Sequence, residues 1–528
     1  MGLRLIIGAV TWAAALGLSG SLKTEPPQGE TYHRFETGAV LARYNQARRT
    51  ATLGAGPPTE DSRRLKPAAQ HVRSEQPTSH LAVRYREPAE RIIRSALADN
   101  DAYDKLEHLC LRIGHRLSGS RELEKAIDWA IEVLKEDGQE NVHREMVMVP
   151  HWVRGEESAT MISPRVEPLY MLGLGGSVGT PPEGITAPVV VVSDEEQLDA
   201  LGPAAKGKIV LFNNPMPRYD PERGASYGPT VRFRSNGARL ASEAGAVACL
   251  VRSVTANSLR SPHTGAMRYG DAKIKIPAAA VSIEDAEMIA RLQRRGAEVV
   301  VRLKMEAKTL PDVQSANVVG ELRGSTRPDE VIVIGGHIDS WDVGHGAHDD
   351  GGGCVMAMEV INVLRKLNMI PRRTIRVVLW TNEENGLRGA RAYARDHEWE
   401  LAKHVAAIEA DSGVFDPRGF SLDCSDKQRE AVAAEQMRDI LSLFPASRWN
   451  MNLTTGHSGA DVGAMKEAGV ILMGHRVEGS KYFDYHHTHA DTIDKVEPKD
   501  LSRNVAVLAV VAYILADMPE RLGERTSR

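Results

Sequence analysis

The apolar positions after residue 317 alternate between two patterns. Short runs made almost wholly of apolar residues predict buried strands, and the segments between them carry the spacing of amphipathic helices. The predicted strands are 331–336, 374–380, 405–410 and 470–474, and the predicted helices are 353–367 and 387–396. This alternation predicts an α/β fold in which helices flank a mixed, mostly parallel sheet.

Helical spacing also marks the region before this one. Residues 89–113 carry it, and a second helix is expected from about Arg121 to Lys135, with its apolar residues on one face. Ser120 is a suitable N-cap for that helix, and Gly138 is suited to end it. Ordered structure is therefore expected to begin near Pro88.

Residues 153–309 have a different pattern. Four short apolar runs, APVVVV, GKIVLF, AVACLVRS and IPAAAVS, are separated by turns rich in Gly and Pro. They predict a smaller, β-rich domain inserted into a larger one. The larger domain is then discontinuous, with the segments 88–152 and 310–520.

The N-terminus has the order of a signal peptide. Arg4 precedes an apolar run over 5–20, which small residues follow. Residues 1–21 are interpreted as a signal peptide that sends the protein out of the cytoplasm, and an uncleaved membrane anchor is the alternative. Residues 22–87, rich in Pro, Arg, Glu, Gln and Thr, are interpreted as a disordered linker. No later segment is apolar enough to span a bilayer.

Composition removes some classes of function. The chain has 528 residues, too many for one simple core. Its net charge of −4 is small and no block of Lys and Arg occurs, so a nucleic-acid partner is not expected. The four cysteines are widely spaced, and three lie in apolar stretches, which argues against a disulfide framework.

Chemically active side chains follow the predicted strands. His337 follows the strand 331–336, Glu383 and Glu384 follow the next, and Asp411 follows the third. The segment YHHTHADT follows the strand near Val470. Any one of these is usually an ordinary polar group, but strands of one parallel sheet bring such groups together at their carboxyl ends. Because buried anions need a compensating charge, the set predicts one or two metal ions.

The ligand types indicate which metal. Nitrogen and oxygen donors without cysteine suit zinc, with manganese or cobalt as possible substitutes. Two ions need a bridging carboxylate, and the pair Asp349-Asp350 is a source of one. Of Glu383 and Glu384, one can bind metal while the other acts as general base on a bound water. The carboxylate of Asp339 is expected to orient the imidazole of His337.

Longer motifs extend this pattern. They are LGLGGSVGTPPEGITA, SPHTGAM, IPAAAVSIEDAEM, GGHIDSWDVGHGAHDDGGG, LWTNEENG, EADSG and YHHTHADTIDKV. Through them the chain, from about Pro88 to Pro519, resembles the carboxypeptidase Q family within the co-catalytic zinc metallopeptidase superfamily. The inserted domain resembles the protease-associated domain, which lies beside the active-site cleft in that family.

The resemblance implies a role for each residue. It implies two zinc ions, a cis peptide bond between Asp349 and Asp350, and Glu383 as general base. The implied metal ligands are His337 and Asp411 for one ion, Glu384 and His487 for the other, and Asp349 as the bridge.

Other histidines are not expected to bind metal. His345 and His348 stand where the family commonly has other residues, and His486 and His489 are expected to support the ligands or lie on the surface. The segment HSGADVGAM matches a pocket-lining loop, so Ser458 and Asp461 are expected to contact substrate.

The expected activity is zinc-dependent exopeptidase cleavage of dipeptides or of terminal residues of short peptides. An aminopeptidase of the same superfamily is the alternative, because the sequence does not show which end is recognised. Glutaminyl cyclases, which bind one zinc, and receptor-like relatives without ligands fit less well, since every ligand position is filled. The resemblance also implies a homodimer.

Overall fold

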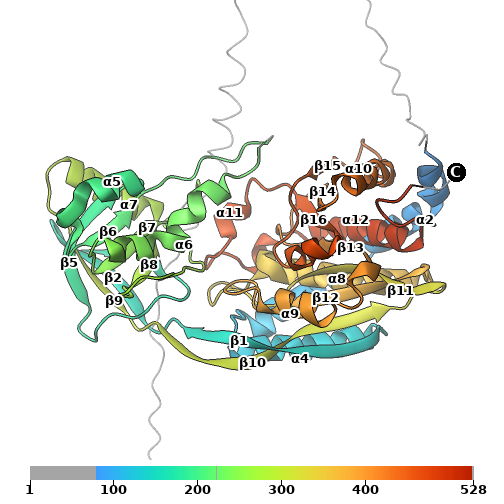
Figure 1. Ribbon diagram of the computed structural model, residues 1–528, viewed down its shortest axis with the longest axis horizontal. Helices are drawn as coiled ribbons and strands as arrows, with labels where there is room; N and C mark the ends of the chain where they lie inside the picture. The colour runs from blue at the N-terminus through green and yellow to red at the C-terminus, as the bar shows by residue number, and fades with distance from the viewer. Residues whose placement is uncertain (1–78, 222, 258, 526–528) are drawn as a thin grey trace, which may run out of the picture. The chain divides into compact units, whose positions relative to one another are not determined.

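The computed structural model describes residues 79–221, 223–257 and 259–525, which contain two eight-stranded sheets (Figure 1). The predicted signal peptide, 1–21, and residues 22–78 of the predicted linker lie outside this part of the chain.

The first sheet has a parallel centre, as the sequence predicted. Strand β11 pairs in parallel with β12 on one side and with β13 on the other, and β13 pairs in parallel with β16. Strands β10 and β14 join this centre in antiparallel fashion. Across the sheet the order is β1 (Glu140–Val153), β10 (Lys308–Leu322), β12 (Arg373–Trp380), β11 (Arg327–His337), β13 (His404–Glu409), β16 (Ile471–Val477), β14 (Pro417–Asp423) and β15 (Asn452–Thr455).

Helices cover both faces of this sheet (Figure 1). Alternate residues of β11 point to opposite faces, so that Ile332 and Ile334 join one core while Val331 and Val333 join another. Helices α8 and α12 pack on the first face and α9 on the second. The helices of this domain are α2 (His80–Leu97), α3 (Asp101–His108), α4 (Arg121–Glu136), α8 (Gly352–Lys366), α9 (Arg388–Asp396), α10 (Lys427–Leu441), α11 (Tyr482–Tyr485) and α12 (Pro498–Asp517).

Ordered structure begins before the predicted boundary at Pro88. Helix α2 starts at His80, within the segment 22–87 that was predicted to be disordered, and Pro88 lies inside the helix. Ser79 caps it by accepting the N–H of Ala82 at 3.0 Å. Its buried residues recur at helical spacing, and this tertiary packing outweighs the polar composition that suggested a linker. They are Ala82, Tyr85, Ala89, Ile92 and Ala96.

Helix α4 follows its prediction closely. Ser120 accepts the N–H of Leu123 at 3.1 Å and so satisfies one of the free donors at the start of the helix. Gly138 has φ +71°, a conformation that glycine adopts without steric cost, and the chain turns there into β1.

The second sheet forms the inserted domain. Its strand order is β3 (Glu167–Leu169), β2 (Glu157–Ser163), β9 (Val300–Met305), β5 (Ile185–Val192), β6 (Ile209–Phe212), β7 (Ala248–Arg252), β8 (Ala278–Val281) and β4 (Met171–Gly173). The helices α5 (Glu195–Leu201), α6 (Tyr227–Glu243) and α7 (Ile283–Arg294) accompany it. The antiparallel strands β1 and β10 carry the chain out of the first sheet and back.

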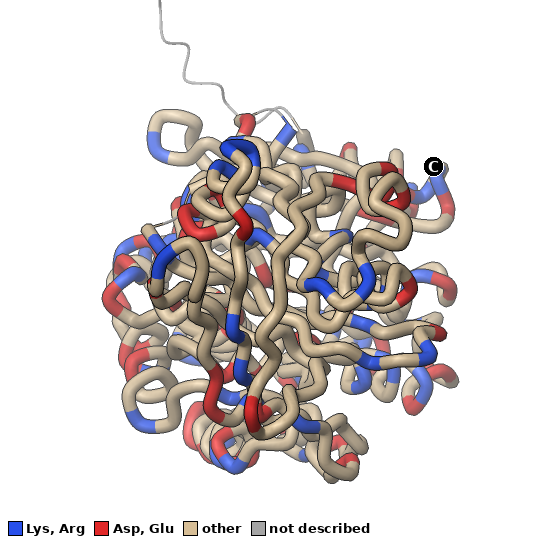
Figure 2. Tube along the Cα trace, turned by 90° about the vertical axis from the view of Figure 1, so that its left-hand side faces the viewer, with Lys and Arg blue, Asp and Glu red and all other residues tan. Residues whose placement is uncertain are grey.

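All four cysteines are buried and free, including Cys424, which the apolar pattern did not place in a core. None of the described helices combines the length and apolar character needed to cross a membrane. Acidic and basic residues are interspersed along the chain rather than gathered into blocks of one sign (Figure 2).

Candidate metal centre

The predicted ligands meet at the carboxyl ends of the parallel strands. His337 is the last residue of β11, Glu384 follows β12, and Asp411 follows β13. Because β12 and β13 flank β11 in parallel register, these three side chains emerge at one edge of the sheet. Asp349 comes from the tight turn Ala347–Gly351 that leads into α8, and His487 follows α11.

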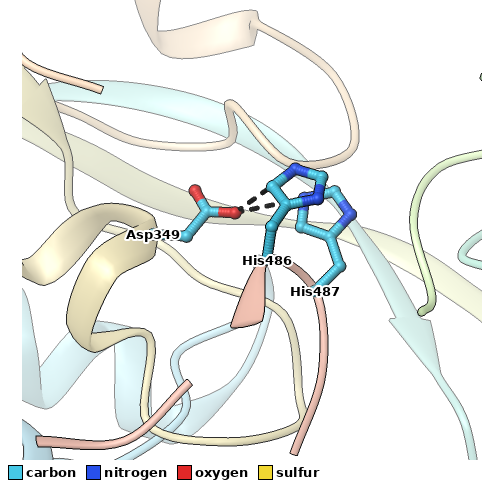
Figure 3. Close-up of side chains that lie close together, drawn as sticks. All are labelled: Asp349, His486 and His487. Carbon is cyan, nitrogen blue, oxygen red and sulfur yellow. Dashed lines mark ion pairs between the residues drawn. The ribbon is translucent and has the colours of Figure 1, made fainter. Parts of the chain in front are cut away.

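Asp349 lies at the centre of the cluster. Its Oδ1 is 3.2 Å from Nε2 of His337, and its Oδ2 is 3.3 Å from Nε2 of His487. Asp411 completes the first side, with Oδ1 3.7 Å from Nε2 of His337. Glu384 completes the second, with Oε2 3.0 Å from Nε2 of His487. One carboxylate thus faces two groups of potential ligands, and Figure 3 shows it beside the histidines of the second.

Hydrogen bonds from Nδ1 to backbone carbonyl oxygens orient both imidazole rings. Nδ1 of His337 lies 3.0 Å from the carbonyl oxygen of Asp339, and Nδ1 of His487 lies 3.2 Å from that of Thr264. A carbonyl oxygen only accepts hydrogen bonds, so each Nδ1 is the donor. With Nδ1 protonated, a neutral ring presents the lone pair of Nε2 to the carboxylates, which is the state needed to bind a cation.

The Asp339 carboxylate lies near the imidazole of His337 without a direct hydrogen bond to it, with Oδ1 3.8 Å from Nδ1. The carbonyl oxygen of Asp339 holds His337, while its carboxylate accepts the backbone N–H groups of Glu383 at 3.0 Å and Glu384 at 3.3 Å. The chain turns after β11 so that the carbonyl oxygen is the hydrogen-bond partner of the imidazole and the carboxylate lies farther from it. Asp339 therefore positions the segment that carries both glutamates.

Glu384 and His487 shift each other's pKa. Burial and the charge of Asp349 raise the pKa of Glu384 to about 7, and His487 opposes the rise. Burial lowers the pKa of His487, but Glu384 and Asp349 outweigh it and raise that pKa to about 10. Trp341 donates its backbone N–H to Oε1 of Glu384 at 3.1 Å and leaves Oε2 facing the histidine.

Asp491 holds the turn that presents Asp349. The carboxylate of Asp491 accepts the backbone N–H groups of Ala347, His348 and Asp349 at 3.1, 2.7 and 3.1 Å. The peptide bond between Asp349 and Asp350 is cis, as the resemblance implied.

Asp350, the second residue of the acidic pair, already accepts backbone hydrogen bonds with both carboxylate oxygens. Asp350 accepts the N–H of His337 at 3.0 Å with Oδ2 and that of Gly353 at 3.1 Å with Oδ1. Of the two carboxylates, Asp349 is the one free to bind a cation.

Unpartnered atoms test whether the residues fit a metal ion. Nε2 of His337, Oδ2 of Asp349 and Oδ1 of Asp411 are buried and have no hydrogen-bond partner among the described residues. His337, Asp349 and Asp411 have donor atoms within 4.8 Å of one another, and so do Asp349, His486 and His487. Unpaired buried carboxylates are costly, and cations between them would remove the cost. Their nitrogen and oxygen donors fit zinc.

Three other histidines near the cluster have three different surroundings. His486 is buried, with Nε2 3.7 Å from Oδ2 of Asp349, so it lies beside the second group of ligands rather than on the surface. His348 uses both ring nitrogens within the protein, accepting the N–H of Val414 at 3.0 Å and contacting the carbonyl oxygen of Lys495 at 3.3 Å. It has no nitrogen left for an ion. His489 is exposed.

The predicted substrate loop lies beside β13. Asp461 is 1% exposed, and both of its carboxylate oxygens lack a hydrogen-bond partner among the described residues. Burial raises its pKa well above the usual value, and the charges of Glu409 and Glu383 add to the rise. Ser458, also buried, stands three residues earlier. Asp461 therefore adds a buried carboxyl group close to Glu383.

The inserted domain contributes residues that the sequence analysis missed. Nη1 of Arg234, in α6, lies 3.4 Å from Nδ1 of His487. Both groups are donors when Nδ1 is protonated, so this contact leaves the guanidinium without an acceptor there. Nε of Arg234 is buried and also has no partner among the described residues. In the sequence Arg234 stands among other basic residues on an ordinary helix, and nothing marks it.

Family models match two parts of the chain. Residues 317–512 match peptidase family M28, and residues 185–289 match the PA domain.

Curated relatives match most of the chain. Carboxypeptidase Q of Mus musculus is 43% identical over 441 residues, which are 83% of this chain and 91% of the relative. Carboxypeptidase Q of Homo sapiens is 43% identical over 80% of this chain and 87% of the relative.

A solved structure has a similar fold. The crystal structure of a peptidase M28 precursor from Shewanella amazonensis SB2B is similar, with a TM-score of 0.77 and 37% identity. The match covers 84% of this chain and 98% of that one.

Proposed function

The chain belongs to the carboxypeptidase Q family of M28 peptidases, a family of zinc-dependent hydrolases, and from that premise we propose that it is a di-zinc exopeptidase acting on short peptides. One observation carries the proposal: the carboxylate of Asp349 lies between His337 with Asp411 on one side and His487 with Glu384 on the other. A shared carboxylate between two sets of ligands is what a pair of ions requires.

In this proposal His337 and Asp411 would hold one zinc, His487 and Glu384 would hold the other, and Asp349 would be shared between them. When bound, zinc supplies a Lewis acid for the peptide carbonyl and lowers the pKa of a water molecule to about 7. The chain's own part is to fix the ligands, and Asp339 does so for both sides through His337 and the Glu383–Glu384 backbone.

Glu383 is the proposed general base. It is partly exposed, unlike Glu384 beside it, and therefore remains accessible to water and substrate. Burial raises its pKa well above the usual value, and the negative charge of Asp411 adds to the rise. Cations in the cluster would oppose both effects and keep the carboxylate charged. Glu383 then accepts a proton from the attacking water and delivers it to the departing amine.

Arg234 supports recognition of a substrate carboxylate. The described part of the chain offers the buried guanidinium of Arg234 no acidic partner, which is costly, and a carboxylate bound there would complete its hydrogen bonds. This favours carboxypeptidase or dipeptidase action. The unpartnered carboxyl group of Asp461 favours the alternative, aminopeptidase action, because it would suit a substrate ammonium group.

Two further proposals concern the protein's setting. The charged start and apolar run at 5–20 support export from the cytoplasm, with an N-terminal anchor as the alternative. The family resemblance supports a homodimer.

Hydrolysis of one dipeptide in three forms tests the function. The free, N-acetylated and C-amidated forms are each incubated with zinc and with a chelator. Chelator-sensitive cleavage of the free and acetylated forms alone indicates a carboxypeptidase. Cleavage of the free and amidated forms alone indicates an aminopeptidase, and cleavage of the free form alone a dipeptidase. If no form is cleaved in a chelator-sensitive way, the proposal fails.

A further inference from the structure

The inserted domain contacts the loop that carries His487 through two consecutive residues, His263 and Thr264. Nδ1 of His263 lies 2.8 Å from the carbonyl oxygen of His486. The N–H of Thr264 donates to the carbonyl oxygen of His487 at 3.0 Å, and the carbonyl oxygen of Thr264 accepts a hydrogen bond from Nδ1 of His487 at 3.2 Å. We call these three hydrogen bonds, from His263 and Thr264 to the 486–487 backbone and ring, the clamp.

The clamp holds a conformation that needs support. His487 has φ +60°, in the left-handed region that residues other than glycine rarely adopt. Such a backbone persists only where its surroundings hold it. Two of the three clamp bonds fall on His487 itself, one on its backbone and one on its ring.

The clamp is fixed to the centre of the inserted domain. The N–H of His263 donates to Oγ of Ser253 at 3.0 Å, and that hydroxyl donates to the carbonyl oxygen of Val281 at the end of β8. The hydroxyl of Thr264 donates to the carbonyl oxygen of Gly173 in β4 at 2.7 Å. These anchors lie on neighbouring strands, so the clamp is a rigid part of the domain.

The side chain of His263 is buried, and only one of its two ring nitrogens has a hydrogen-bond partner among the described residues. It is 1% exposed, and since Nδ1 must be the donor to a carbonyl oxygen, Nε2 carries the lone pair. Nε2 has no hydrogen-bond partner among the described residues. A buried polar atom without a partner lowers the stability of the protein. His263 therefore destabilises the fold through Nε2, while its Nδ1 holds the carbonyl oxygen of His486.

A second connection reaches Glu384. Arg154, at the start of the inserted domain, binds Oδ2 of Asp342 through Nε at 2.8 Å and also contacts the Thr264 hydroxyl at 3.4 Å. Asp342 adjoins Trp341, whose N–H donates to Glu384. Both ligands on the second side of Asp349 are therefore connected to the inserted domain.

The first side of Asp349 is held differently. Nδ1 of His337 contacts the carbonyl oxygen of Asp339, and the N–H of His337 donates to Asp350. These partners belong to the peptidase domain. Because the two sides have different supports, we infer that the inserted domain sets the affinity of one metal position, that of His487 and Glu384, and that His263 is its positioning residue. This inference rests on the proposed di-zinc function.

Zinc titration of the metal-free enzyme by calorimetry tests the inference. The wild type is expected to bind two zinc ions. His263→Ala is expected to bind one with unchanged affinity and the other about 10- to 100-fold more weakly, the usual effect of losing a group that orients a ligand. His263→Asn, whose amide can donate to the His486 carbonyl, is expected to restore most of the loss.

His475→Ala is the matched control. His475 is also a buried histidine whose Nε2 has no partner among the described residues, but it lies in β16 and has no hydrogen bond to either ligand loop. It should reduce thermal stability while both zinc affinities stay normal. If His263→Ala is unfolded at the assay temperature, His263→Leu, which keeps the volume and removes Nδ1, replaces it.

Three results would overturn the inference. Equal weakening of both sites, or of neither, in the His263 variants would show that the clamp has no selective effect. Failure of His263→Asn to restore affinity would show that the hydrogen bond is not the cause. A wild type that binds fewer than two zinc ions would overturn the di-zinc proposal, and the inference with it.

Discussion

Oδ1 of Asp349 lies 3.2 Å from Nε2 of His337, and that nitrogen has no hydrogen-bond partner among the described residues. A neutral imidazole and a carboxylate that face each other through lone pairs repel unless a cation lies between them. The second oxygen of Asp349 lies 3.3 Å from Nε2 of His487. This arrangement gives Asp349 a task that an uncharged side chain of equal size cannot perform.

Asp349→Asn is expected to lose zinc and activity together. The amide keeps the volume but removes the charge shared by two ions, so kcat/KM should fall at least about 100-fold and zinc content should drop below two per chain. Elemental analysis of the purified variant, with thermal unfolding as the control for folding, measures this. A variant that keeps both ions and most of its activity would show that Asp349 does not bridge.

Glu383→Gln is expected to separate metal binding from turnover. Because Glu383 is proposed to move protons and not to hold metal, zinc content should remain at the wild-type value while kcat falls by about 10²- to 10⁴-fold. Steady-state kinetics on the same preparations used for elemental analysis provides the measurement. Loss of zinc in this variant would assign Glu383 to the ligand set instead.

Arg234→Met is expected to affect only substrates with a free carboxylate. Loss of a charge-assisted hydrogen bond should raise their KM by about 10- to 100-fold with a smaller change in kcat. Arg234→Lys should recover part of the affinity because it keeps the charge without the planar guanidinium. A C-amidated peptide is the control substrate, and an equal loss with both substrates would contradict carboxylate recognition.

His397 gives a pH-dependent contribution to stability. Its Nε2 lies 2.7 Å from Oε1 of Glu145 and its Nδ1 contacts Glu400. Burial alone would lower the pKa of His397, but hydrogen bonds to these carboxylates raise it to about 9 from 6.5. Hydrogen bonds from His143 and His397 lower the pKa of Glu145 to about 2, and those from His397 and Arg376 lower the pKa of Glu400 to about 2.

A histidine whose pKa is raised by folding stabilises the folded state fully at pH values below its pKa in the unfolded state. This stabilisation is lost as the pH rises through its pKa in the folded state. The ion pairs of His397 should therefore contribute about 1–3 kcal/mol near pH 7 and little near pH 10. Urea unfolding of the wild type and of His397→Gln at both pH values tests this. The gap between the two proteins should shrink as the pH rises, and a constant gap would refute the assignment.

The strands and main helices could be predicted from apolar patterns because burial on both faces of a sheet needs long apolar runs. Strand β11 and helix α8 lie within a few residues of their predicted positions. The start of α2 was missed because its apolar residues are few and a proline stands inside the helix.

The cluster around Asp349 could be predicted because each of its residues follows a strand of the parallel sheet or belongs to a long motif. The orientation of Asp339 could not, since it depends on which way a peptide group turns after β11. His263 and Arg234 come from a domain inserted between distant parts of the larger one. No local pattern connects them to His487, and only the folded chain brings them together.

Crystallographic anomalous diffraction at the zinc edge tests the di-zinc site most directly. Two peaks about 3.5–4 Å apart are expected, one beside His337 and Asp411 and the other beside His487, with the Asp349 carboxylate between them. A single peak, or two peaks of which Asp349 contacts only one, would contradict the proposed site.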